Sequence, residues 1–309
     1  MATADTRTLV IGEALIDAVT TATGEHAEHV GGSPANVAFG LAALDHPVDL
    51  ATWIATDERG LRIEDVCRSR GITLTPGSLG APFTSVADAR LDATGAATYT
   101  FDLEWQLAAV PDLTSYAHVH TGSIAVVLEP GGSAVRATLA AARGTATISY
   151  DPNARPTLMG APEVARRLIE EAIASADVVK LSDEDVAWLC PGETIDEALT
   201  GWAALGPALL VVTRGGEGAI VRLGRTGEER ALAATPVTVV DTVGAGDSFM
   251  AGLVSGLLDA GLLGGAEARD RLRAASMDDV LPAVERALLT GARTVARAGA
   301  HAPVRADLS

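Results

Sequence analysis

Short apolar segments recur along the chain, and segments with helical spacing of apolar residues separate them. The apolar segments are candidate strands at 8–12, 48–55, 118–127, 145–151, 176–182 and 208–215, and most of them end in Gly, Ser or Asp. Helical spacing covers 34–44, 60–70, 131–142, 161–175, 183–189, 195–205, 247–260 and 279–298. Alternation of strands with helices is typical of a parallel sheet covered by helices. The pattern therefore predicts an α/β protein whose ligands bind at the carboxyl ends of the strands.

Two segments break this alternation. Residues 13–30 and 83–104 have the pattern of hairpins, and the second is predicted to turn at Thr94 and Gly95. Because hairpins do not belong in a doubly wound core, we expect a small separate sheet that serves as a lid or as a dimer clasp. No repeat or linker divides the chain, so residues 1–309 are predicted to form a single domain. The polar segment 259–279 is predicted to be a surface excursion.

The chain is strongly acidic, with a formal net charge of −17 and a pI near 4.7. Such a surface repels nucleic acid and anionic membrane, so neither is an expected partner. The first residues have neither a basic region nor a long apolar core, and no apolar run is long enough to span a membrane. We therefore expect a cytoplasmic protein. Its two cysteines, Cys67 and Cys190, have no metal-binding spacing.

The segment DTVGAGDSFMAGL, residues 241–253, suggests phosphate chemistry. Gly244 and Gly246 let the backbone approach a ligand, and a helix that begins near Asp247 adds the positive end of its dipole. The amides of Gly244, Ala245, Gly246 and Asp247 would form an anion hole, and Asp247 beside it could accept a proton from an attacking hydroxyl. The alternative is a glycine turn in which Asp247 caps the helix. No P-loop, dinucleotide fingerprint or GxSxG nucleophile motif is present.

Two further segments contain candidate ligand contacts. In VGGSPANVAFGLAAL (30–44), a glycine pair precedes a helix that has Asn36 on its first turn. This is either a plain glycine turn or a hinge at Gly31 and Gly32 with Asn36 as a polar contact. In GEALIDAV (12–19), Glu13 and Asp17 are either edge-strand charges or hydroxyl-binding groups.

Three loops follow apolar strands: YDPNARP (150–156), KLSDED (180–185) and VVTRGGEG (211–218). Each is an ordinary strand-end loop when taken alone. Together, on one edge of a sheet, they predict a cleft to which Arg155 and Lys180 bring positive charge for phosphate. Lys180 is the only lysine of the chain.

In this order, these segments resemble the ribokinase-like (PfkB) carbohydrate kinases. GGSPANVA is similar to the N-terminal signature of that family, and DTVGAGDSFMAGL to its C-terminal signature. GEALID, DPNARPTL, KLSDEDVAWL and TRGGEGA look most like bacterial fructokinases. The resemblance implies a three-layer α/β/α fold with a mostly parallel sheet, plus a small β-sheet lid. It also implies transfer of the ATP γ-phosphate to a hydroxymethyl group of a sugar, with Mg²⁺ and an activating K⁺.

The resemblance also implies roles for single residues. Asp247 would be the general base, and the amides of 244–247 the anion hole. Sugar contacts would come from Asp17, Gly32, Asn36 and Arg155. The nucleotide side would comprise Lys180, Ser182, Thr213, Gly215, Gly218 and Thr242, and Asp241 would belong to a monovalent-cation loop. Where the family has an Asn-x-x-Glu element that organises water around Mg²⁺, this chain has Ser182 and Asp185.

The resemblance leaves the acceptor open among related substrates. D-fructose is the favoured acceptor, and the alternatives are 2-keto-3-deoxygluconate or another sugar or nucleoside. A catalytically idle sugar-binding protein on the same fold is a further alternative. The intact Asp247 and both glycines argue against it.

Overall fold

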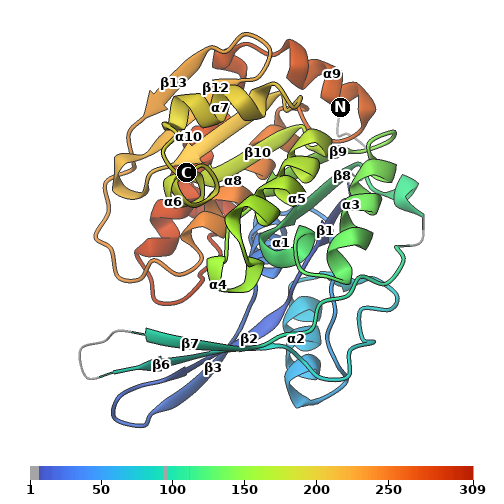
Figure 1. Cartoon of the computed structure of the whole chain (residues 1–309), viewed down its shortest axis with the longest axis vertical. Coiled ribbons are helices and arrows are strands. Elements are labelled where there is room, and N and C mark those ends of the chain that lie inside the picture. Colours follow the sequence, from blue (N-terminus) through green and yellow to red (C-terminus); the bar gives the residue numbers. More distant parts are fainter. Residues whose placement is uncertain (1–6, 93–96, 111, 309) are drawn as a thin grey trace.

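The computed structural model describes residues 7–92, 97–110 and 112–308. Its main feature is a nine-stranded sheet in the order β13-β12-β11-β10-β9-β8-β1-β4-β5 (Figure 1). The strands are β1 (Thr8–Ile11), β4 (Val48–Ala51), β5 (Thr73–Leu74), β8 (His118–Gly122), β9 (Thr147–Asp151), β10 (Val178–Ser182), β11 (Leu209–Thr213), β12 (Ala219–Leu223) and β13 (Glu229–Leu232). From β11 to β5 all neighbours are parallel, whereas β12 and β13 run antiparallel. The mostly parallel sheet predicted from the sequence is therefore confirmed.

Helices cover both faces of this sheet and make it the middle of three layers. One face packs against α1 (Ser33–Ala43), α2 (Glu58–Ser69), α8 (Ala245–Asp259), α9 (Ala266–Ala274) and α10 (Met277–Val295). The other face packs against α3 (Gly131–Ala142), α4 (Pro156–Met159), α5 (Pro162–Ser175), α6 (Asp183–Leu189) and α7 (Ile195–Ala203). Alternate strand residues supply the two cores, as in β1, where Val10 lies in the first and Leu9 in the second. None of the helices in the described parts of the chain has the length and apolarity to cross a membrane.

A second, four-stranded sheet extends from one side of the main body (Figure 1). It consists of β2 (Leu15–Thr20), β3 (His26–Gly31), β6 (Val86–Leu91) and β7 (Ala97–Asp102), in the order β3-β2-β6-β7. Both predicted hairpins are thus present, and β2 pairs in parallel with β6 to join them. The turn expected at Thr94 and Gly95 lies outside the described residues.

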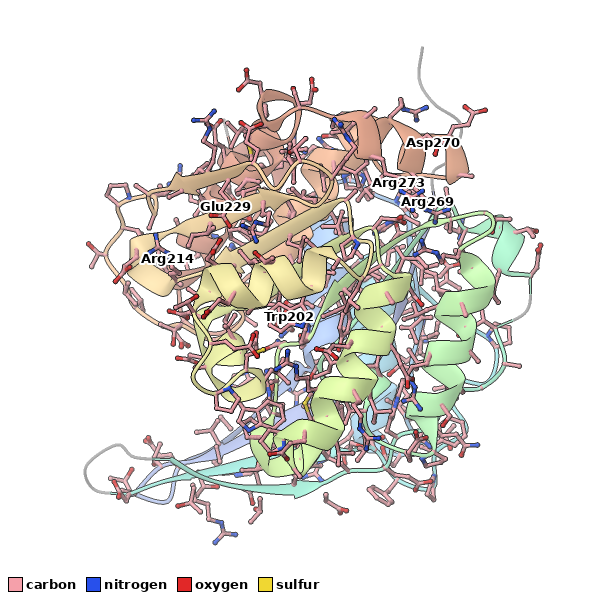
Figure 2. All side chains as sticks on the ribbon, turned by 45° about the horizontal axis from the view of Figure 1, so that its top comes forward. Trp202, Arg214, Glu229, Arg269, Asp270 and Arg273 are labelled. Atoms are coloured by element: carbon pink, nitrogen blue, oxygen red, sulfur yellow. The ribbon has the colours of Figure 1, made fainter. Side chains whose placement is uncertain are left out.

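The structure differs from the sequence-based expectation in three segments. The predicted strand 118–127 ends at Gly122 and continues as a short 3-10 helix, Ser123–Val126, with the other 3-10 turns at Leu113–Ser115, Gly215–Glu217 and Arg305–Leu308. The antiparallel strands β12 and β13 were not predicted. The segment 259–279 is not merely a surface excursion, because α9 buries Arg269, whose guanidinium pairs with Asp177 at 2.7 Å (Figure 2 labels Arg269).

Candidate active site

The predicted site residues converge where the parallel strands end, on the side of the sheet covered by α1 and α8. The first turn of α1 faces the first turn of α8, because side chains of Ser33 and Asn36 both bond to Asp247. The loop after β9 reaches the same point through Asn153. Residues far apart in the sequence thus meet at the edge where open α/β sheets bind ligands.

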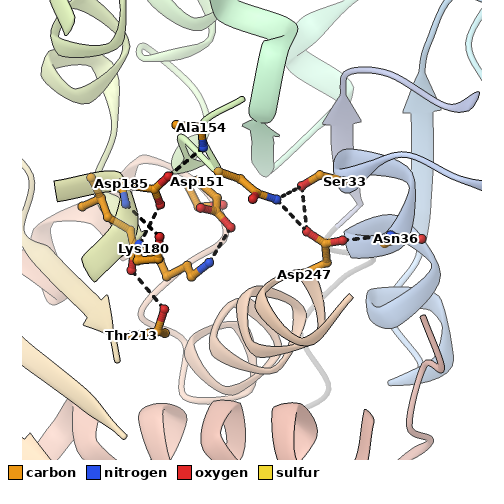
Figure 3. Close-up of polar contacts among 12 residues, drawn as sticks. Ser33, Asn36, Asp151, Ala154, Lys180, Asp185, Thr213 and Asp247 are labelled. Atoms are coloured by element: carbon orange, nitrogen blue, oxygen red, sulfur yellow. Dashed lines mark hydrogen bonds and ion pairs between the residues drawn. The ribbon is translucent and has the colours of Figure 1, made fainter. Parts of the chain in front are cut away.

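Asp247 is the third residue of α8, and its side chain is buried. Ser33 Oγ donates a hydrogen bond to Oδ1 at 2.7 Å, and Asn36 Nδ2 donates to Oδ2 at 2.8 Å (Figure 3). Asn153 Nδ2 lies 3.1 Å from Oδ1. These three partners are neutral donors that fix the orientation of the carboxylate. Oδ1 accepts two of these hydrogen bonds and Oδ2 only one, so a lone pair of Oδ2 remains for a further proton donor.

Asn153 links Asp247 to Arg155. Its Nδ2 also lies 2.7 Å from Ser33 Oγ, and its Oδ1 accepts a hydrogen bond from Arg155 Nη1 at 2.6 Å. Asn153 has a φ of 36°, in the left-handed region that asparagine tolerates better than most residues. Arg155 therefore orients the groups around Asp247 through Asn153, which the sequence analysis did not single out.

The first turn of α8 begins at a glycine in the left-handed region and leaves two backbone amides unbonded among the described residues. Gly244, the N-cap, has a φ of 73°, and a Cβ there would lie 2.6 Å from the Cβ of Ala300. The N–H groups of Gly246 and Asp247 have no acceptor among the described residues, whereas Ser248 N–H already bonds to the Gly244 carbonyl. Two free amides at a helix N-terminus form a binding site for negative charge.

Two further acidic residues, Glu13 and Asp17, lie close enough to Asp247 for its charge to affect their pKa values. Glu13 is buried, and burial raises the pKa of its carboxyl to about 7, although Ser123 and Arg155 oppose the shift. Burial, and next the charge of Asp247, raise the pKa of Asp17 to about 6. Gly31 and Gly32 are needed beside them: a Cβ on Gly31 would lie 1.9 Å from Asp17 Oδ2, and one on Gly32 2.5 Å from the Glu13 carbonyl oxygen. Close packing therefore accounts for the glycine pair.

Lys180 reaches the same site from β10. Its side chain is buried, and Nζ lies 2.9 Å from Asp151 Oδ2 (Figure 3). Nζ also lies 3.0 Å from the position that a Cβ on Gly246 would occupy. Lys180 thus places a positive charge directly against the first turn of α8.

Residues predicted for the nucleotide side lie along the ends of β10 and β11. Ser182 caps α6, and Thr213 Oγ1 bonds to the Leu181 carbonyl at 3.3 Å. The turn that contains Gly215 follows β11, and a Cβ on Gly218 would lie 2.0 Å from the Leu232 carbonyl oxygen. Gly218 is therefore required by the packing of its loop against the end of β13.

Asp185 is held by backbone donors. One carboxylate oxygen accepts from Ala154 N–H and the other from Ser182 N–H, each at 2.7 Å. The described residues contain no group of three or more His, Cys, Asp or Glu side chains that could hold a metal ion. Asp185 thus ties the loop after β9 to the start of α6.

The loop before α8 is joined to the turn after α10. Asp241 Oδ2 accepts from Gly299 N–H at 2.8 Å, and Oδ1 accepts from Val243 N–H at 3.1 Å. These backbone donors, Gly299 foremost, lower the pKa of Asp241. The Thr242 carbonyl accepts from Ala245 N–H. The Asp241 loop, which is predicted to hold a monovalent cation, therefore lies beside the turn that contains Gly299.

Comparison with known proteins identifies the family to which the chain belongs. The sequence profile of the pfkB family carbohydrate kinases matches residues 5–306. A fructokinase of Klebsiella pneumoniae is 34% identical over 265 residues, which cover 82% of this chain and 85% of that protein.

Solved structures show the same fold. A fructokinase of Xylella fastidiosa with bound ATP superposes with a TM-score of 0.84 at 22% identity, covering 98% of this chain and 97% of that one. A fructokinase double mutant of Vibrio cholerae with bound fructose, ADP and potassium ion gives a TM-score of 0.79 at 25% identity, with the same coverage. With the family profile matched along nearly its whole length, the chain belongs to the PfkB family of carbohydrate kinases.

Proposed function

We propose that this protein is a fructokinase, which transfers the γ-phosphoryl group of ATP to a hydroxymethyl group of D-fructose. The observation that carries the proposal is the buried carboxylate of Asp247 beside two free amides at the start of α8. A base and an anion hole in contact are what phosphoryl transfer to an alcohol requires. The fructokinase of Klebsiella pneumoniae supports the choice of sugar.

In the proposed reaction, Asp247 accepts the proton of the sugar hydroxyl. The hydroxyl oxygen then forms a bond to the γ-phosphorus, and the bond from that phosphorus to the bridging oxygen of ADP breaks. The free amides of Gly246 and Asp247 receive the negative charge on the transferring phosphoryl group, whereas the Ala245 amide, part of the predicted anion hole, already bonds to the Thr242 carbonyl. Ser33, Asn36 and Asn153 hold Asp247 in position throughout.

The sugar would bind between Asp247 and the four-stranded sheet. Asp17 lies on β2 of that sheet, and Asn36 and Gly32 lie at the start of α1, so hydroxyl-binding groups surround the proposed position. We propose that the four-stranded sheet acts as the lid, which excludes water that could otherwise hydrolyse ATP. Arg155 completes the pocket through Asn153.

The nucleotide would lie along the opposite side of α8, near Ser182, Thr213, Gly215 and Thr242. Three valines of the loop leading to α8 support this placement, because Val239, Val240 and Val243 each expose more than half of their area: 58%, 62% and 52%. A purine ring can cover such an apolar surface.

We expect activity to require Mg²⁺ and to be higher in K⁺ than in Na⁺ or Li⁺. Magnesium offsets charge on the phosphates and is usually held by them together with one or two carboxylates, for which Asp185 is the candidate through a bound water. Carbonyls of the Asp241 loop and of the turn at 297–300 would hold K⁺. Initial rates at constant ionic strength test both cations. Equal rates in potassium and in sodium buffer would contradict the K⁺ site.

We expect the highest kcat/KM for D-fructose among fructose, ribose, adenosine and 2-keto-3-deoxygluconate. The acidic side chains around the lid repel an anionic acceptor: Glu13, Asp17, Glu25, Glu28, Asp88, Asp92, Asp102 and Glu104, against Arg90. An ADP-release assay across the four acceptors measures the preference. A tenfold advantage for the keto-acid would assign Arg155 to its carboxylate and refute the fructose assignment. No turnover of any acceptor would favour a sugar-binding protein.

A further inference from the structure

Lys180 is an unusual residue to find buried in this protein. It is the only lysine of the chain, and only 3% of its side chain is exposed. Burial would lower its pKa, but the charges of Asp151, Asp185 and Asp247 together raise it. Burial raises the pKa of Asp151 to about 6, so near neutral pH the pair is an ammonium facing a carboxylate.

The ammonium has spare hydrogen-bonding capacity. Within the described residues its one hydrogen bond goes to Asp151 Oδ2, although an ammonium has three N–H donors. The nearby His120 does not compete for charge, because burial, and next the charge of Lys180, lower its pKa to about 3. Because Nζ lies beside Gly246, its remaining N–H donors are close to the free amides of Gly246 and Asp247.

The partner of Lys180 is also incompletely bonded. Asp151 Oδ1 is buried and has no hydrogen-bond partner among the described residues. A buried carboxylate oxygen without a hydrogen-bond partner lowers the stability of the fold. Stability therefore does not explain Asp151, whereas holding the charged ammonium of Lys180 in place does.

We infer that Asp151 is a positioning residue, which holds the ammonium of Lys180 charged and against the first turn of α8. Lys180 then donates to an oxygen of the transferring phosphoryl group and keeps its own proton, while the hydroxyl proton goes to Asp247. This inference rests on the proposed function and extends it. In this role Lys180 stabilises the negative charge that develops on the phosphoryl group during transfer, and contributes little to binding of the nucleotide before the reaction.

The test compares Lys180→Met, Asp151→Asn and the double variant. We expect Lys180→Met to lower kcat on the order of 10²–10³-fold, as does loss of one oxyanion donor. Asp151→Asn should lower kcat on the order of 10- to 100-fold, because the ammonium is no longer held in place. The dissociation constant of ADP should change little in either variant. The double variant should lose no more than Lys180→Met, because both changes act on one contact.

Asp151→Asn leaves the buried ammonium of Lys180 without a partner and could fold poorly. The double variant removes both charges, so it can still be assayed in that case. Asp177→Asn is the matched control: it breaks another buried pair, Arg269–Asp177 at 2.7 Å, at the opposite ends of the strands. It should lower the melting temperature and leave kcat unchanged.

Three results would overturn the inference: a wild-type kcat in either single variant, losses that add up in the double variant, or a loss confined to ADP binding. If Asp247→Asn is inactive in the same assay, the proposed function survives these results. A wild-type enzyme that phosphorylates no sugar would overturn both.

Discussion

Asp247→Asn should remove nearly all turnover and leave the fold intact. Loss of a general base typically lowers the rate on the order of 10²–10⁴-fold. The amide oxygen of asparagine can still accept a hydrogen bond from Ser33, and Asn36 can turn its own amide so that its oxygen accepts from the new NH₂ group. The amide cannot take the proton of a sugar hydroxyl. The loss should therefore appear in kcat, measured by ADP release with saturating fructose. Thermal unfolding should be close to that of the wild type.

A matched control separates catalysis from helix capping. Asp279 occupies the third position of α10, as Asp247 does in α8, but it is exposed, and among the described residues its side chain bonds only to Ser276. Asp279→Asn should leave kcat unchanged, because asparagine is tolerated near helix N-termini almost as well as aspartate. If Asp247→Asn were as active as Asp279→Asn, the assignment of Asp247 as the base would be wrong, and a structural role in the first turn would remain.

The sequence predicted the main architecture because hydrophobic periodicity reports burial directly. The strands β1, β9, β10 and β11 lie where apolar segments were found, and their polar ends lie together at one edge. Parallel strands force this convergence, so Lys180 and Arg155 could be assigned to a common cleft without any knowledge of distances.

What the sequence could not predict depends on contacts between distant segments. Asn153 bonds to Ser33 and Asp247, which lie 120 and 94 residues away in the sequence, and no local pattern encodes such contacts. The contact of Ser33 with Asp247 spans an even longer stretch of the chain and is equally absent from any local pattern. Asp151 and Lys180 can pair because they lie on neighbouring strands. The functional role of the pair, however, depends on the short distance between Lys180 and Gly246, which the sequence does not reveal.

The boundaries of some strands were predicted wrongly for a related reason. The segment 118–127 was predicted as one strand because its second half is apolar, but that half is buried as a 3-10 turn rather than as a strand. β13 was missed because it is mostly exposed and therefore lacks the apolar signal of an inner strand.

Glu13→Gln should stabilise the ligand-free protein at pH 8, by about 3 kcal/mol. In the folded protein the pKa of Glu13 is about 7, against 4.5 ordinarily, so between these values the folded state keeps a proton that the unfolded state has lost. The free energy of unfolding of the wild type therefore falls as the pH rises through this range. Glutamine resembles the protonated acid and carries no such penalty.

The pH dependence distinguishes this cause from a general improvement in packing. At pH 5 Glu13 is mostly protonated when folded, so the advantage of glutamine should shrink to less than about 1 kcal/mol. Urea unfolding at both pH values measures the difference. Glu197→Gln is a control for which the opposite effect is expected. Backbone and side-chain hydrogen bonds from Thr194 lower the pKa of Glu197, so its charged form stabilises the folded state. Replacing it with glutamine should therefore lower the free energy of unfolding at pH 8. Equal stability of Glu13→Gln and wild type at pH 8 would show that Arg155 offsets the buried charge.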